Sequence, residues 1–283
     1  MEPHPPGPRH VPFDGRPPTI SMGLRPLGDL PWLEVDAHRD EELAEKARLL
    51  ATRPREVVAT LPAGDAGAAE TLELVLAENR GRGIAHPVGT GEAFLRELHP
   101  IDAAGRIAQE DFCVMVREEG RWILASASVC APSQWRLADK IGRDITAIHD
   151  PVPDYERIRT PVERFFDRIV VDRPVWRTNW TLLGDPTRFQ PEPQADAVGG
   201  EVDAAAVVLR VERQTLRLLP RSGAVLFTIR TFVDRLDTLP PAARADLAAT
   251  LAGADDDLIA YRGWERVLPA VLTWLTDGAD AEG

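Results

Sequence analysis

Two stretches in the first third of the chain carry apolar residues at helical spacing. In residues 40–50 (DEELAEKARLL) acidic residues come first, basic residues follow, and leucines recur at helical intervals. This order suits the helix dipole and predicts a helix. A second helix is predicted over residues 66–79 (AGAAETLELVLAEN), which Gly81 and Gly83 close. We expect these two helices to pack together as an N-terminal layer.

After Pro100 the spacing of apolar residues becomes that of β-strands. Residues 106–130 predict a hairpin, with two β-rich runs around the turn EEG at 118–120. Three later runs have the same character: VWRTNWTLL (175–183), AAAVVLRVERQTLRLL (204–219) and AVLFTIRTFV (224–233). The turn LPRSG at 219–223 joins the last two as a second hairpin.

Further helices are predicted around these strands. In SQWRLADKIG, Ser133 suits an N-cap and Gly142 a C-terminal stop. Another helix is predicted from Thr160 onward, with Pro161 at its first position, and a final helical region covers 240–276. Clustered consecutive strands flanked by helices favour an α+β fold with an antiparallel sheet over a doubly wound parallel sheet.

Composition indicates an ordinary globular protein, with 44% hydrophobic and 28% charged residues in 283. Residues 1–20 contain seven prolines, so we expect an extended or disordered arm there and a single domain over 21–283. The sequence shows no apolar run long enough for a membrane helix and no secretory signal. Cys113 and Cys130 have neither metal-ligand spacing nor the density of a disulfide scaffold, which favours a reducing cytoplasm.

The charge balance argues against one class of partner. The chain has 45 acidic and 33 basic residues and a net charge of −12. A surface that binds nucleic acid needs clustered Lys and Arg to neutralise phosphates. We therefore expect no nucleic-acid partner, although one local basic pocket remains compatible with this charge.

Among six histidines, His149 has the most distinctive setting. It ends the apolar segment ITAI, and Pro151 and Pro153 restrict the backbone after it. A rigidly presented imidazole suits ligation of a metal or of heme iron. The alternative is an ordinary half-buried histidine hydrogen-bonded in a turn. His99, just before Pro100, could cap or satisfy a turn.

The strand at 204–219 alternates charged and apolar residues. One face is predicted to carry Val211, Arg213, Thr215 and Arg217, and the other Arg210, Glu212 and Gln214. Its arginines could form a pocket for an anionic group such as a carboxylate or propionate. They could equally belong to an exposed face with cross-strand ion pairs, each worth less than about 1 kcal/mol.

Several longer stretches, taken together and in order, resemble one known family. They are MGLRPL (22–27), PWLEVD (31–36), QEDFCVM (109–115), SVCAPSQWRLADKIG (128–142), AIHDPVPDY (147–155), VERFFDRI (162–169), VWRTNW (175–180) and LRVERQTLRLLPRSGAVLFTIRTF (209–232), with a looser match at AYRGW (260–264). The family is the heme-containing catalytic (alpha) subunit of heme-dependent oxidative N-demethylase.

The resemblance implies a PAS-like fold that binds heme b and performs oxygen chemistry in place of sensing. The implied reaction uses O2 to oxidise a small secondary amine, dimethylamine, to methylamine and formaldehyde. Electrons would come from NADPH through flavin and iron–sulfur centres on partner reductase subunits. The sequence agrees with that division, because it has no GxGxxG after a strand and no cysteine quartet.

The resemblance also implies roles for individual residues. His149 is expected to be the proximal ligand of the heme iron, with His99 next in line. Glu212 is expected to hold the protonated amine near the iron, although Arg210 and Arg213 could simply neutralise it. The residues expected to contact the heme propionates are Arg213, Arg217, Arg221 and Arg230.

Two other functions stay open at this point. A relative of this family could be a non-enzymatic heme-PAS sensor of gas or redox state, or a binding module. A cofactor-free interaction protein is the third class, and in it His149 would be an ordinary turn residue. An absorbance spectrum of the purified protein separates the last class from the other two.

Overall fold

The computed structural model describes residues 8–19, 21–149, 152, 155–192 and 202–280. Across these residues seven strands form one antiparallel sheet in the order β1-β5-β6-β7-β3-β4-β2. The strands are β1 (Arg25–Pro26), β2 (Val58–Thr60), β3 (Asp111–Glu118), β4 (Arg121–Ser128), β5 (Val175–Leu183), β6 (Val208–Leu218) and β7 (Val225–Arg235). The α+β class is confirmed, and the PAS-like description stays a prediction.

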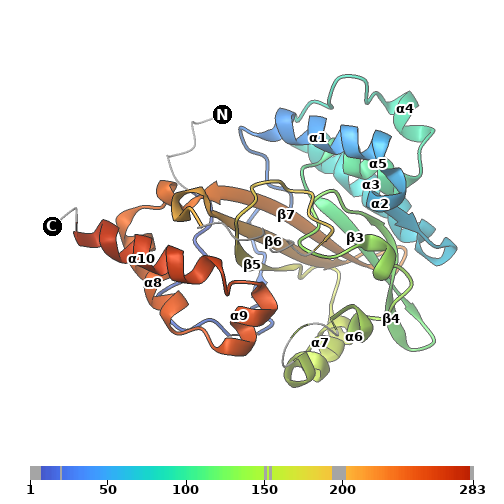
Figure 1. Ribbon diagram of the computed structural model, residues 1–283. Helices are drawn as coiled ribbons and strands as arrows, with labels where there is room; N and C mark the ends of the chain where they lie inside the picture. Colours follow the sequence, from blue (N-terminus) through green and yellow to red (C-terminus); the bar gives the residue numbers. More distant parts are fainter. Residues whose placement is uncertain (1–7, 20, 150–151, 153–154, 193–201, 281–283) are drawn as a thin grey trace.

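The helices fall into three groups around the sheet (Figure 1). The N-terminal group is α1 (Arg39–Thr52), α2 (Pro54–Val57), α3 (Asp65–Gly81), α4 (Glu92–Arg96) and α5 (Pro100–Ile107). The middle pair is α6 (Ile145–His149) and α7 (Tyr155–Arg168). The C-terminal group is α8 (Pro241–Ala252), α9 (Asp256–Arg262) and α10 (Val267–Asp280). These helices lie before, between and after the long strands and do not alternate with them.

The strand predictions are confirmed. The β3–β4 hairpin turns at Glu119 and Gly120, both with positive φ (47° and 81°), which is the geometry that suits a tight hairpin between twisted strands. Strand β6 starts at Val208 instead of residue 204, because residues 204–206 form a short 3-10 helix first.

Two helix predictions are wrong. No helix covers 133–142: Ser133 pairs with Gln190 in a β-bridge, Gln134 has a φ of 62°, and only Leu137–Asp139 forms a 3-10 turn. Helix α7 starts at Tyr155 and contains Pro161 in its interior. Pro161 is exposed, so water can take the place of the hydrogen bond that its missing N–H would have donated.

The N-terminal layer contains a helix that the pattern did not predict. Helices α1 and α3 both pack on α5, which starts at Pro100 and has His99 as its N-cap. The His99 Nδ1 accepts a hydrogen bond from the backbone N–H of Ile101 (3.3 Å). The capping role considered for His99 is therefore confirmed.

The two faces of the sheet have different coverings, and we name each by one residue of β6. On the Arg213 face, α3 and α5 pack over Phe112 and Leu226 at one end, and α8 and α10 pack over Val211 and Phe232 at the other. On the Glu212 face, α6 and α7 pack over apolar residues of β3, β6 and β7. The described strands thus form one sheet, and separate apolar clusters lie on its two faces.

The described part of the N-terminal arm, residues 8–19, has no helix or strand, yet it packs against the C-terminal helices. Phe13 is 6% exposed and meets the Trp180 ring edge-on at 5.4 Å. The backbone N–H of Gly15 donates to Thr250 Oγ1 (3.2 Å). One residue of the described part of the arm, Phe13, therefore belongs to the core. The extended or disordered arm expected over residues 1–20 stays a prediction.

Within the described ranges, no helix combines the length and the apolar composition that crossing a membrane requires. Cys113 and Cys130 are both free and buried. The cytoplasmic location stays a prediction.

We predict that Phe13→Ala lowers the free energy of unfolding by about 3 kcal/mol, because it removes a buried aromatic ring from the cluster under α8 and α10. Urea unfolding followed by circular dichroism measures this loss. Phe94→Ala is the control, since Phe94 is 38% exposed and should cost much less. Equal losses in the two variants would show that the arm does not contribute to the core.

Candidate functional site

On the Arg213 face, buried arginines meet carboxylates from the segment 31–36. Arg213 is 1% exposed, and its Nε lies 3.0 Å from Glu34 Oε1. Its guanidinium also donates to the backbone carbonyl of Pro31 (2.6 Å) and lies over the Trp176 ring. A buried guanidinium is tolerated only when its donors and its charge are both satisfied, and this segment supplies both.

Arg230 lies directly across the ladder from Arg213 and is equally buried. Its guanidinium pairs with Asp36 Oδ2 (2.6 Å) and Glu42 Oε2 (2.9 Å). Gln109 donates to both carboxylates, at 3.0 Å and 2.7 Å. Burial alone would raise the pKa of Asp36, but the Arg230 charge and the Gln109 hydrogen bond together leave that pKa lowered.

Arg213, Arg230, Glu34, Asp36 and Glu42 form an ion cluster on this face. Glu110 lies beside this ion cluster, and its pKa is raised. It is 1% exposed, and its Oε1 accepts a hydrogen bond from the backbone N–H of Glu34 (2.6 Å). Burial raises the pKa of Glu110 to about 7, against the opposing charges of Arg230 and Lys46. The pKa of Glu110 is therefore shifted in the opposite direction to those of Glu34 and Asp36, which are lowered.

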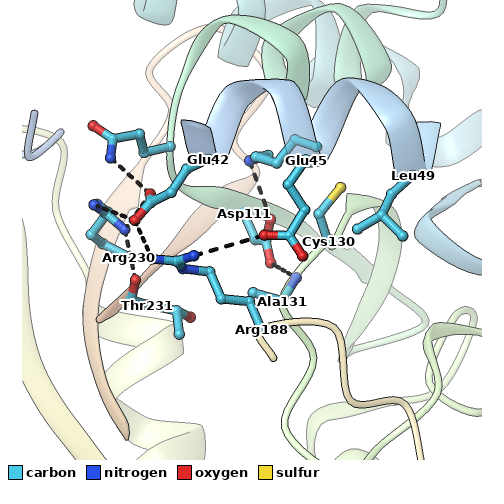
Figure 2. Close-up of a pocket in the computed structure, with 11 residues that line it drawn as sticks. Glu42, Glu45, Leu49, Asp111, Cys130, Ala131, Arg188, Arg230 and Thr231 are labelled. Atoms are coloured by element: carbon cyan, nitrogen blue, oxygen red, sulfur yellow. Dashed lines mark hydrogen bonds and ion pairs between the residues drawn. The ribbon is translucent and has the colours of Figure 1, made fainter. Parts of the chain in front are cut away.

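A cavity of about 20 Å³ lies where α1 meets the end of β3 and the strand β7 (Figure 2). Two of its lining residues have a buried polar atom without a hydrogen-bond partner among the described residues, Arg188 Nε and Thr231 Oγ1. Beside them Asp111 Oδ1 forms an ion pair with Lys46 Nζ (3.2 Å). One water molecule would fit there and could bond these atoms. The cavity is far too small for a cofactor, so the site for one must be sought elsewhere.

His149 lies on the other side of the sheet, at the C-terminal end of α6. Its Nδ1–H donates to the backbone carbonyl of Ile145 (2.7 Å), which sets the tautomer and leaves Nε2 with its lone pair. Nε2 has no partner among the described residues. Burial lowers the pKa of His149, and the charges of Lys140 and Arg177 lower it further, against the Ile145 hydrogen bond. A neutral imidazole with a free Nε2 is the form that ligates iron.

Glu212 lies in the middle of β6 and is 8% exposed. Its Oε2 accepts hydrogen bonds from Gln214 Nε2 (3.1 Å) and Asn179 Nδ2 (3.4 Å). Its Oε1 lies 3.5 Å from Arg210 Nε. Of the two arginines considered as its neutralising partners, Arg210 pairs with Glu212 and Arg213 faces the other way.

Two arginines near Glu212 were missed by the sequence analysis. Arg177 lies across the ladder from Gln214 on the Glu212 face, and Arg262 of α9 donates to Asn179 Oδ1 (2.9 Å). The Nε of each is buried without a hydrogen-bond partner in the described part of the chain. Burial lowers the pKa of both, while the Glu212 charge raises it.

A sequence signal for Arg177 did exist. Strand alternation in VWRTNW puts Trp176, Thr178 and Trp180 on one face, which leaves Arg177 on the opposite face together with Asn179. Arg262 had no such signal, because only the packing of α9 beside β5 brings it to Asn179.

Two of the predicted site residues lie on the same side of the sheet: Glu212 is on β6, and His149 ends α6, which packs on the Glu212 face through Ile145 and Ile148. The charge of Arg177 acts on His149, and the charge of Glu212 acts on Arg177. The four arginines predicted to contact propionates lie elsewhere. Arg213 and Arg230 are in the ion cluster of the opposite face. Arg217 has its guanidinium carbon 5.0 Å from the centroid of the Trp32 ring. Arg221 lies in the β6–β7 turn and pairs with Glu73 of α3. Their contact with heme stays a prediction, and these placements do not support it.

One comparison with known proteins bears on this arrangement. A family model described as "Haem-dependent oxidative N-demethylase, alpha subunit-like" matches residues 23–272. The match runs from just before β1 into α10 and includes both faces of the sheet. The arm at 8–19 lies outside it.

We predict that Glu110→Gln changes how stability depends on pH. The folded pKa of Glu110 is raised from its ordinary 4.5 to about 7. Folding therefore takes up a proton between these values, and stability from this group falls as the pH rises through them. Relative to the variant, the unsubstituted protein should lose about 3 kcal/mol of unfolding free energy from pH 4.5 to 7.5.

Urea unfolding at four pH values across that range measures the difference. Glu118→Gln is the control, because Glu118 is exposed at the end of β3 and should leave the pH dependence unchanged. Parallel curves for the unsubstituted protein and Glu110→Gln would show that Glu110 does not titrate in this window.

Proposed function

Because the chain belongs to the family of haem-dependent oxidative N-demethylase alpha subunits and similar proteins, we propose that it binds heme b and removes a methyl group from a small secondary amine. Dimethylamine is the candidate substrate, and methylamine and formaldehyde are the products. The observation that carries this proposal is that α6, the helix that ends at His149, packs on the face of the sheet that carries Glu212.

The residues on this face fit a heme group. His149 is neutral, has its Nδ1–H bonded to a carbonyl, and keeps Nε2 available for iron. Arg177 and Arg262 each have a buried Nε with no partner among the described residues, and guanidinium groups of this kind suit the carboxylates of heme propionates. His149 would hold the iron, and these two arginines support the propionate role better than the four first considered.

The bound heme would supply the oxidising chemistry, and the chain would supply binding and position. A dialkylammonium ion entering a largely buried site costs several kcal/mol unless a carboxylate accompanies it. Glu212 offers that carboxylate, and the amide groups of Asn179 and Gln214 hold it in place. Glu212 would thereby keep one N-methyl group at a fixed position on the face that carries His149.

The overall reaction needs a source of electrons. One oxygen atom of O2 enters a C–H bond of the N-methyl group, and the resulting carbinolamine breaks its C–N bond to release formaldehyde. The second oxygen leaves as water, which requires two electrons and two protons. We propose that NADPH supplies the electrons through flavin and iron–sulfur centres on partner subunits. The words "alpha subunit-like" in the family description support a multi-subunit system.

The non-enzymatic alternative is a heme-PAS sensor, and both readings share a PAS-like sheet. The order of the five long strands, β4-β3-β7-β6-β5, with helices on both faces supports that description. A sensor of a neutral gas needs no anion beside the heme. Arg210 pairs with Glu212 Oε1, whereas Oε2 accepts hydrogen bonds from the neutral amides of Asn179 and Gln214. It is this second oxygen that supports an amine substrate over gas sensing.

We predict that His149→Ala abolishes the Soret spectrum of an imidazole-ligated heme when the purified chain is titrated with hemin. The unsubstituted protein should show that spectrum, because its Nε2 is free to bind iron. His99→Ala is the control, since His99 already caps α5 and pairs with Asp65. An unchanged spectrum in His149→Ala would place the ligand elsewhere, and absence of heme binding in the unsubstituted protein would contradict the proposed function.

We predict that Glu212→Gln raises the KM for dimethylamine about tenfold or more, or abolishes turnover, while the heme spectrum stays intact. A neutral amide cannot offset the charge of the ammonium. Formaldehyde release with a supplied reductase system measures turnover, and Glu118→Gln is the exposed control. Loss of heme from Glu212→Gln would make Glu212 structural, and full activity would remove it from the amine site.

A further inference from the structure

The His149 ring lies flat against a second aromatic ring. Tyr155, the first residue of α7, stacks on it with ring centroids 4.9 Å apart and planes 6° from parallel. Tyr155 is 5% exposed, and its hydroxyl is buried without a hydrogen-bond partner among the described residues. Burial raises the pKa of Tyr155 to about 12, so the stacked ring is the neutral phenol.

We propose that Tyr155 is a positioning residue for His149. This role rests on the proposed function, in which His149 Nε2 ligates the heme iron. The hydrogen bond from Nδ1–H to the Ile145 carbonyl sets the tautomer, but a single hydrogen bond lets the imidazole rock about the donor atom. The flat face of Tyr155 removes that freedom, because any tilt of the imidazole would collide with it or open a gap.

The two rings come from different elements, so the stack also ties α6 to α7. The end of α6 is held separately, because Lys140 Nζ donates to the backbone carbonyl of Ile148. Three contacts thus converge on this short helix: Lys140 orders its backbone, Ile145 sets the tautomer of His149, and Tyr155 sets the ring plane. A ligand of iron needs both its tautomer and its plane defined, and residues that supply this orientation affect metal affinity about 10–100-fold.

The positioning role belongs to the aromatic ring of Tyr155, because the ring makes the stack and the hydroxyl has no partner among the described residues. Phe166, on the same helix, is a buried aromatic ring in a different setting: it is 6% exposed and packs against Trp122 with centroids 5.7 Å apart. The feature that distinguishes Tyr155 from Phe166 is its contact with His149.

The test compares Tyr155→Leu, Tyr155→Phe and the matched control Phe166→Leu in the full-length chain. Without heme, NMR spectra of protein labelled with ¹⁵N-histidine report the tautomer and the ring-current shift of His149, which His149→Ala assigns. The unsubstituted protein, Tyr155→Phe and Phe166→Leu should all show the single Nδ1–H tautomer and the shift caused by the stacked ring. Tyr155→Leu should lose that shift.

Hemin titration and the Fe–N(His) stretching band of the reduced protein then test the consequence. Tyr155→Leu should bind heme about tenfold or more weakly and shift or broaden that band, while Tyr155→Phe and Phe166→Leu keep both values. The proposal is overturned if Tyr155→Leu keeps the unsubstituted affinity and band, or if Phe166→Leu lowers affinity equally, which would indicate a packing effect. Failure of the heme assignment is separable, because it would appear as His149→Ala retaining the spectrum of the unsubstituted protein.

Discussion

The arrangement of this protein depends on two buried arginines, Arg213 and Arg230, that lie across from each other on β6 and β7. Neither could stay buried in the sheet without carboxylates, because an unpaired interior charge costs several kcal/mol. Glu34 and Asp36 supply those carboxylates from the segment 31–36. That segment must therefore cross the middle of the Arg213 face, and its crossing separates the apolar cluster under the N-terminal helices from the cluster under the C-terminal helices.

Occupation of one face by ion pairs leaves the other face for chemistry. Strand alternation sends Arg213 toward the ion cluster and Glu212 toward α6 and α7. The same strand thus contributes to stability on one side and to the candidate site on the other. This division explains why the arginine-rich stretch did not form one pocket for an anionic group: its charged residues are shared between two environments with different partners.

The proposed function calls for three kinds of group, and the Glu212 face and the helices beside it offer a candidate for each. His149 offers a neutral imidazole, Glu212 offers a buried carboxylate, and Arg177 and Arg262 offer buried N–H donors without partners among the described residues. Each comes from a different structural setting: His149 from the end of a short helix, Glu212 from the middle of a central strand, and the two arginines from β5 and from α9 beside it. The sheet holds these settings at fixed spacing, which is the pre-organisation that a bound cofactor and substrate need.

The sequence by itself determined the local periodicities. The two-residue alternation of 175–183, 204–219 and 224–233 specified strands and assigned Glu212 and Arg213 to opposite faces, and the setting of His149 identified it as a ligand candidate. Tertiary structure alone decided which partners these side chains meet. Glu34 reaches Arg213, Arg262 reaches Asn179, and Pro161 is tolerated inside α7 because packing and solvent override local preference. Spacing along a chain encodes the direction of a side chain, whereas its partner depends on how segments distant in sequence pack together.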